Sequence, residues 1–130
     1  MIVVDTSALI AMLAREPEHQ RFLTVLDGVE RRLVSAVTYY EAGIVMRARA
    51  GQDGQSDLDD LLHEIDAEIV PFDGVLAKVA LDAYSRFGKG IHPARLNLGD
   101  CASYALAKSM NAPLLFKGGD FTHTDVVAAG

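Results

Sequence analysis

Short apolar runs alternate with longer amphipathic stretches along this chain. Residues 2–4, 32–35, 68–72 and 114–116 are rich in Ile, Val, Leu and Phe and predict strands, of which 68–72 has the pattern of a buried one. Parallel strands need crossover connections and are covered on both faces. The alternation therefore predicts an α/β fold with helices on both faces of a small, mainly parallel sheet.

In the segments between these strands, apolar residues recur at the spacing that is typical of helices. We expect helices over about 8–13, from Pro17 onward, from Thr38 as the cap to near Gly51, over about 56–65, over about 75–87, and from Asp100 to Met110. Residues 51–54 and the glycine-rich stretch 88–99 are typical of loops, and Gly118 and Gly119 of a turn.

Composition narrows the class of protein. The 130 residues are 50% hydrophobic and suit one domain, 1–130, with no disordered tail. The single cysteine, Cys101, cannot form an internal disulfide, and no apolar run approaches the roughly 18 residues of a membrane span. We expect a soluble cytoplasmic protein without contact to the membrane.

Four acidic residues stand at positions where elements meet. Asp5 and Asp120 follow predicted strands and fall on the same sheet edge, where ligands of open α/β sheets bind, while Glu41 and Asp100 lie in first turns of helices. Each has a simple structural role available as a helix cap, a dipole partner or a turn residue. Their combination at one edge favours chemistry instead.

Gathering carboxylates is unfavourable unless a cation joins them, because two like charges ~4 Å apart repel by about 4 kcal/mol at an effective dielectric near 20. Mg²⁺, or alternatively Mn²⁺, prefers oxygen ligands and leaves positions for a phosphate oxygen and a water. Bound metal also weakens the objection that a net charge of −6 disfavours a nucleic-acid partner. Asp5, Glu41, Asp100 and Asp120 are therefore candidate metal ligands and catalytic residues.

Other residue types support rather than replace this chemistry. The four histidines show no paired metal-ligand spacing, and Cys101 follows Asp100, whose charge raises a thiol pKa. Ser7 is placed to orient Asp5 or a water. Lys117, three residues before Asp120, is a candidate phosphate contact, and tyrosines such as Tyr104 are candidates for base stacking, although either type can equally serve the surface or the core.

At these residues the sequence resembles the PIN-domain ribonucleases and, within them, the VapC toxins of bacterial toxin-antitoxin pairs. The resemblance covers nearly the whole chain. Its carriers are the segments VVDTSALIAML, YYEAGIVMRAR, YSRFGKGIHPARLNLGDCASYALAK and PLLFKGGDFTHTDV.

The resemblance implies a three-layer α/β/α PIN fold with four to five strands and Mg²⁺- or Mn²⁺-dependent hydrolysis of RNA by a metal-activated water. It also implies a VapB-like antitoxin that blocks the site, contact with DNA only through that antitoxin, and a homodimer, which the apolar stretch 75–84 favours independently.

Residue by residue, the resemblance assigns Asp5, Glu41 and Asp100 to the family's first three acids and Asp120 to the fourth. Asp125 is an alternative for the fourth, because the GGDF–THTD ending departs from many relatives. Ser7 matches the family's small hydroxyl residue after the first acid, and Asn97 belongs to the same loop motif as Asp100. Thr6, Asp125 and Lys117 are further supporting candidates.

Two other functions fit parts of the pattern. An apolar strand ending in Asp also opens haloacid-dehalogenase-type phosphatases, but these need a second Asp two residues later, where this chain has Ser7. A catalytically silent module that only binds a partner protein is the second alternative.

Overall fold

The structure, a computed structural model, describes residues 1–130 and is built on a four-stranded parallel sheet. The strands are β1 (Ile2–Val4), β2 (Arg32–Ser35), β3 (Ala67–Val70) and β4 (Leu114–Leu115). Their order is β3-β2-β1-β4, and every pairing is parallel. The predicted small parallel sheet is therefore confirmed.

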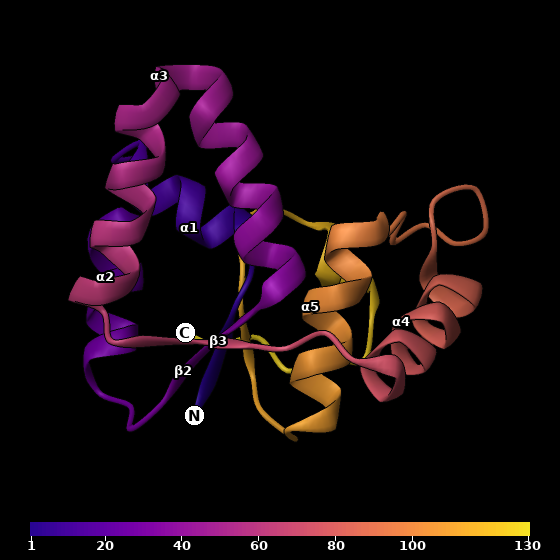
Figure 1. Ribbon diagram of the computed structural model, residues 1–130. Helices are drawn as coiled ribbons and strands as arrows, with labels where there is room; N and C mark the ends of the chain where they lie inside the picture. Colours follow the sequence, from indigo (N-terminus) through magenta and orange to yellow (C-terminus); the bar gives the residue numbers. More distant parts are fainter.

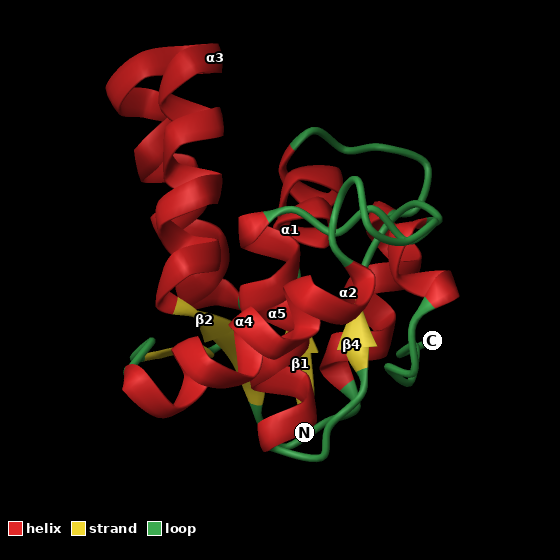
Figure 2. Cartoon of the chain, turned by 90° about the vertical axis from the view of Figure 1, so that its right-hand side faces the viewer, coloured by secondary structure: helices red, strands yellow, loops and turns green.

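Five α-helices connect the strands and cover both faces of the sheet (Figures 1 and 2). They are α1 (Thr6–Leu13), α2 (His19–Asp27), α3 (Ala36–Glu64), α4 (Gly74–Phe87) and α5 (Leu98–Ser109), followed by a short 3₁₀ helix, Asp120–His123. No helix combines the length and the apolar character needed to cross a membrane.

The side chains of β1 show why three layers form. Ile2 and Val4 belong to the core cluster shared with α1, α2 and α3, whereas Val3 belongs to the cluster shared with α4 and α5. Successive strand residues point to opposite faces, so an unbroken apolar strand requires a cover on each side. The expected α/β/α arrangement follows.

Strand β3 corrects one prediction, because it is not buried. It pairs only with β2 at the edge of the sheet, and both Glu68 and Ile69 are exposed. The Glu68 carboxylate accepts two hydrogen bonds from the guanidinium of Arg31, at 2.8 and 3.0 Å. An edge strand has a neighbour on one side only, so polar side chains remain in contact with water there.

Helix α3 corrects a second prediction, because residues 51–54 do not form a loop. The chain reverses sharply at Ala50 and Gly51, and Gly51 has a left-handed φ of 56° that glycine adopts without strain. A Cβ on Gly54 would overlap the backbone carbonyl of Met46, so the two arms of α3 touch closely. The resulting helical hairpin projects from the body in both views (Figures 1 and 2).

The start of α3 also differs from the sequence prediction. Ser35, the last residue of β2, caps the helix by accepting a hydrogen bond from the backbone N–H of Val37 at 3.2 Å. Thr38, the predicted cap, lies inside the helix and is fully buried. Strand β2 therefore passes directly into α3, and Glu41 moves from the first turn to the second.

Candidate active site

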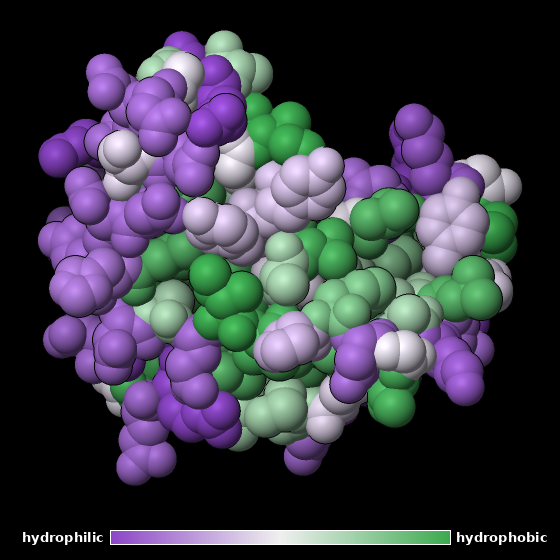
Figure 3. Space-filling model, viewed as in Figure 1, coloured by the Kyte–Doolittle hydropathy of each residue, from purple (hydrophilic) through white to green (hydrophobic).

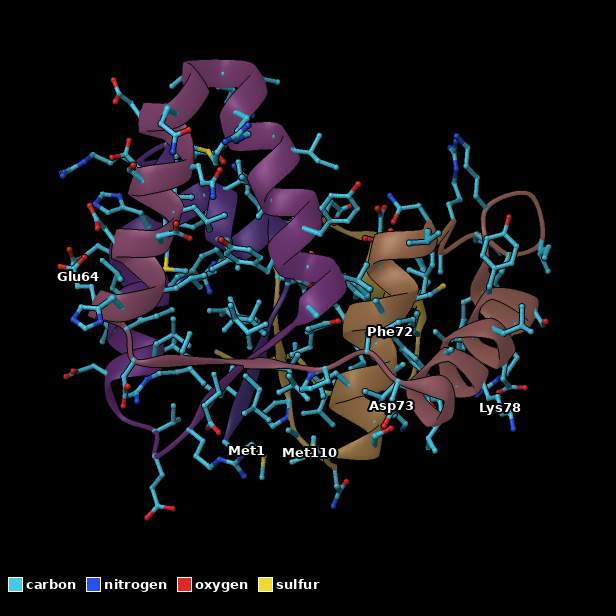
Figure 4. The ribbon with its side chains drawn as sticks, viewed as in Figure 1. Met1, Glu64, Phe72, Asp73, Lys78 and Met110 are labelled. Atoms are coloured by element: carbon cyan, nitrogen blue, oxygen red, sulfur yellow. The ribbon has the colours of Figure 1, made fainter.

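The carboxyl ends of β1 and β4 open onto the edge of the sheet where α3 and α5 begin. Asp5 follows β1, and Lys117 lies two residues beyond β4. Met1 and Met110, which mark the start of β1 and the end of α5, both lie toward the opposite, lower edge in Figure 4. The predicted placement of ligand-binding groups at one sheet edge therefore has a structural basis.

Asp5 is almost fully buried, with 2% of its surface exposed, and it caps α1. Its Oδ2 accepts hydrogen bonds from the backbone N–H of Ser7 at 3.0 Å and from the Ser7 hydroxyl at 2.7 Å. Its Oδ1 accepts a hydrogen bond from the Ser103 hydroxyl at 2.6 Å. The carboxylate is thus held by groups from two helices.

Ser7 and Lys117 connect β4 to the first acid. The backbone N–H of Lys117 donates to the Ser7 hydroxyl at 3.0 Å. The ammonium of Lys117 binds the carboxylates of Glu16 at 2.6 Å and Glu18 at 3.3 Å, and the Glu16 hydrogen bond raises the pKa of Lys117. A phosphate contact from this ammonium would therefore compete with two acids already in place.

Glu41 is oriented by groups next to the other acids. Thr6, which follows Asp5, donates its hydroxyl to Oε1 of Glu41 at 2.6 Å. The same carboxylate lies against Gly99, where a Cβ would overlap both of its oxygens. Glycine at the start of α5 therefore makes room for Glu41 beside Asp100.

Asp100 lies in a capping box at the start of α5. Its backbone N–H donates to Oδ1 of Asn97 at 2.8 Å, and its own Oδ2 accepts from the backbone N–H of Asn97 at 3.0 Å. Asp100 is thus the third residue of the helix rather than its first, and Asn97 fixes its orientation.

Burial first, and then the charges of Asp5, Asp120 and Glu41, raise the pKa of Asp100 to about 7, against the lowering effect of the Asn97 N–H. The four predicted acids therefore share one electrostatic neighbourhood. None of them forms an ion pair with Lys or Arg, whose bridges all involve other acids. No ion pair with a basic side chain offsets their mutual repulsion.

The donors of this site are oxygen atoms, which suits Mg²⁺ or Mn²⁺ better than zinc. No group of three or more Asp, Glu, His or Cys side chains is arranged to hold a metal ion by itself. An open arrangement fits a cation that keeps several water ligands and takes only some of its ligands from protein. The residues present therefore fit a hydrated divalent cation.

Asp120 and Asp125 lie in different surroundings. Asp120 is exposed at the start of the 3₁₀ helix, and its charge acts on Asp100. Asp125 instead accepts a hydrogen bond from the hydroxyl of Tyr104 and pairs with Lys108 at 3.2 Å. The charge of Asp120 therefore reaches Asp100, whereas the carboxylate of Asp125 is engaged by Tyr104 and Lys108.

The structure also bears on the predictions for Tyr104 and Cys101, which both lie on α5. Tyr104 is buried, with a pKa raised to about 12 by burial and by Asp125, so its ring is not available for base stacking. Burial and the charge of Asp100 raise the pKa of the Cys101 thiol to about 11, in the predicted direction. Cys101 is therefore an unreactive core residue.

Sequence reasoning missed two hydroxyl groups below the acids, those of Ser103 and Thr38. Both are fully buried, and their oxygens lie 3.1 Å apart. A usable signal was present in the sequence: Ser103 follows Asp100 by three residues, which places both on one side of a helix. Thr38 precedes Glu41 by the same interval.

Comparison with known proteins identifies relatives along nearly the whole chain. The PIN-domain family model matches residues 2–127. Ribonuclease VapC30 of Mycobacterium tuberculosis is 46% identical over 125 residues, which cover 96% of this chain and 95% of the relative. Ribonuclease VapC of Mycolicibacterium smegmatis is 45% identical over 127 residues and 98% of each chain.

Solved structures share the fold at much lower identity. VapC20 of M. tuberculosis, described as a sarcin-ricin loop cleaving toxin, superposes with a TM-score of 0.77 at 18% identity and covers 98% of this chain and 97% of its own. VapBC2 of Rickettsia felis, bound to a DNA fragment from its promoter, gives the same score and identity over 98% and 96%. The fold and the closer sequence relatives together show that this chain belongs to the PIN-domain family and, within it, to the VapC ribonucleases.

Proposed function

We propose that this chain is a divalent-metal-dependent endoribonuclease that hydrolyses RNA phosphodiester bonds as the toxin of a type II toxin-antitoxin pair. One observation carries the proposal: four carboxylates without a basic partner share one sheet edge in a member of the VapC ribonucleases. A divalent cation supplies the positive charge that this arrangement lacks, and RNA supplies the phosphate that meets it.

Asp5, Glu41, Asp100 and Asp120 would hold Mg²⁺ or Mn²⁺. When bound, the cation polarises the phosphodiester and makes a water nucleophilic at neutral pH. Other residues of the protein orient these carboxylates by hydrogen bonds: Ser7 holds Asp5, Thr6 holds Glu41, and Asn97 holds Asp100. Asp100 must lose its proton before it binds a cation, so its raised pKa links metal binding to pH.

Cleavage of total cellular RNA tests the proposal. We expect the wild type to cut RNA with Mg²⁺ or Mn²⁺ and not with EDTA. Asp5→Asn and Asp100→Asn should each lower the rate by at least about 100-fold, because each removes a charge from the cation site. Asp57→Asn is the matched control, since Asp57 is exposed on the outer arm of α3 and its loss changes the net charge equally.

Undiminished cutting by Asp5→Asn and Asp100→Asn would refute the proposed site. Folded wild type that neither binds Mn²⁺ nor cuts RNA would support the silent partner-binding module instead. The phosphatase alternative is already disfavoured, because the relatives are ribonucleases and Ser7 binds Asp5 where such phosphatases need an acid.

The fourth acid is tested by a separate pair of variants. We expect Asp120→Asn to lose RNA cleavage and Asp125→Asn to retain it, because of these two acids only Asp120 acts on the half-buried Asp100. The carboxylate of Asp125 already accepts hydrogen bonds from Tyr104 and Lys108. Loss of cleavage in Asp125→Asn alone, with unfolding unchanged, would reverse the assignment.

The proposed partner is a VapB-like antitoxin that covers the acids, and DNA is contacted only through it. Support comes from structural neighbours that are toxin-antitoxin complexes, including one from Klebsiella pneumoniae and the DNA-bound complex from R. felis. We place the protein in the reducing cytoplasm, consistent with a single buried cysteine. Growth arrest on expression, relieved by Asp5→Asn or by a co-expressed antitoxin, would support this role.

A further inference from the structure

Two buried hydroxyl groups lie directly beneath the proposed cation site. Ser103 and Thr38 have no exposed surface, and they come from α5 and α3, the helices that also carry Asp100 and Glu41. Each hydroxyl lies one helical turn from the acid of its own helix. The pair therefore joins the two helices at the level of Asp5.

The donor of each hydrogen bond between Thr38, Ser103 and Asp5 can be assigned. The Ser103 hydroxyl has one proton, and Asp5 Oδ1 at 2.6 Å can only accept it. At the 3.1 Å contact between the two hydroxyls, Thr38 must then be the donor. The hydrogen bonds run in one direction, from Thr38 to Ser103 to Asp5.

These hydrogen bonds determine how many lone-pair positions of the Asp5 carboxylate remain free. An ionised carboxylate has about four lone-pair positions. The Ser7 N–H and hydroxyl use two on Oδ2, and Ser103 uses one on Oδ1. Asp5 is held at both oxygens and has about one position left, on Oδ1, for a further partner.

The two hydroxyls differ from those of Thr24 on α2 and Ser85 on α4. Thr24 and Ser85 donate to the backbone carbonyl four residues earlier, at 2.9 and 3.1 Å, which is the usual local arrangement. Ser103 and Thr38 donate across elements instead. Packing of α3 against α5 alone would be served by apolar side chains, so the hydroxyls point to a role toward Asp5.

We propose that Ser103, itself oriented by Thr38, is a positioning residue that fixes the Asp5 carboxylate for a divalent cation. The inference rests on the proposed function, because it assumes that Asp5 binds that cation. Groups that orient a metal-binding carboxylate typically change metal affinity by about 10- to 100-fold when they are removed. Ser103 acts through Asp5 and needs no contact with RNA.

Calorimetric titration of the purified protein with Mn²⁺, without RNA, tests the proposal. We expect Ser103→Ala to weaken Mn²⁺ binding at least about 10-fold. Thr38→Val, which keeps the shape and removes the hydroxyl, should weaken it less, while Thr38→Ser should restore wild-type affinity. Ser85→Ala is the matched control, because Ser85 is exposed on α4 and bonds only a backbone carbonyl.

Unfolding measured in EDTA shows that each variant is folded at the temperature of titration. If Ser103→Ala does not fold, the difference between Thr38→Val and Thr38→Ser decides the question. Wild-type affinity in Ser103→Ala, or equal affinities of the two folded Thr38 variants, would overturn the inference while the proposed function stands. Absence of Mn²⁺ binding by the wild type would overturn both.

Discussion

Asp100 is the carboxylate whose protonation the fold changes most clearly among the four acids. Its ordinary pKa of 3.8 rises to about 7, first because of burial and then because of the charges of Asp5, Asp120 and Glu41. The folded chain therefore binds a proton at Asp100 more tightly than the unfolded chain does. A cation would relieve this preference by opposing the same charges.

The first prediction concerns the pH dependence of stability without metal. Since the folded pKa is raised, the stabilisation is fully present below about 3.8 and is lost as pH rises through about 7. In EDTA, Asp100→Asn should therefore flatten the fall in unfolding free energy between about pH 4 and pH 7. Urea unfolding of both proteins across this range measures it, and parallel curves would contradict the expected role of burial.

The second prediction concerns Gly99, where a methyl group would displace the Glu41 carboxylate. A flexible side-chain end can move at low cost, so Gly99→Ala should change the unfolding free energy by less than about 1 kcal/mol. RNA cleavage and Mn²⁺ affinity should fall by at least about 10-fold, because the acid is misplaced. Gly74→Ala is the control, since Gly74 starts α4 and has open space around it. Equal activity of the two variants would argue against a role for Glu41.

At the scale of elements, β1, α3 and α5 form the frame of the site. Asp5 follows strand β1, β2 passes through Ser35 into α3, and Asn97 caps α5. The alternating pattern predicted these elements and a mainly parallel sheet. It did not predict the hairpin of α3, because the close contact between Gly54 and Met46 joins positions that only the folded chain brings together.

The third prediction compares two glycines of α3. Gly54→Ala should destabilise the protein by about 1–3 kcal/mol or more, since its Cβ would meet a backbone carbonyl that cannot move freely. Gly43→Ala should be neutral or stabilising by up to about 1 kcal/mol, because its Cβ only reaches ordinary contact with Leu58 at 4.0 Å and alanine favours helices. Thermal unfolding distinguishes them, and similar midpoints would mean that the two arms tolerate separation.

At the scale of the whole molecule, one face carries apolar side chains that the chain itself leaves uncovered. Val75, Leu81 and Tyr84 of α4 and Leu98 of α5 are exposed, and a groove of about 550 Å³ lies between these helices. Figure 3 shows apolar residues gathered on this side of the molecule, between α3 and α4. Such a surface is typical of an interface, and we propose that it pairs two copies of the chain.

The fourth prediction tests this pairing. Light scattering should give about twice the 14.0 kDa chain mass for the wild type at micromolar concentration. Leu81→Glu and Val75→Glu should shift the mass to that of one chain, because each places a charge in an apolar interface. Val127→Glu, equally exposed outside this face, should remain paired. A monomeric wild type would exclude the proposed homodimer.

The sequence by itself determined the α/β class, the parallel sheet, and the positions of Asp5, Glu41 and Asp100 near the ends of predicted elements. These properties depend on periodicity and on glycine, proline and capping residues, which act over a few neighbouring positions. The prediction failed for β3 because burial depends on a strand's place in the sheet, which local pattern does not record.

Only the tertiary structure distinguished the surroundings of Asp120 from those of Asp125, and only it showed that Ser103 and Thr38 are hydrogen-bonded in series beside Asp5. Asp120 and Asp125 are five residues apart in a turn-rich segment, so spacing alone leaves both within reach of the site. The contact between Ser103 and Asp5 joins residues 98 positions apart. Such contacts arise where α3, α5 and β1 cross. They cannot be predicted from local sequence patterns, because the geometry of the crossing is set by the packing of the whole core.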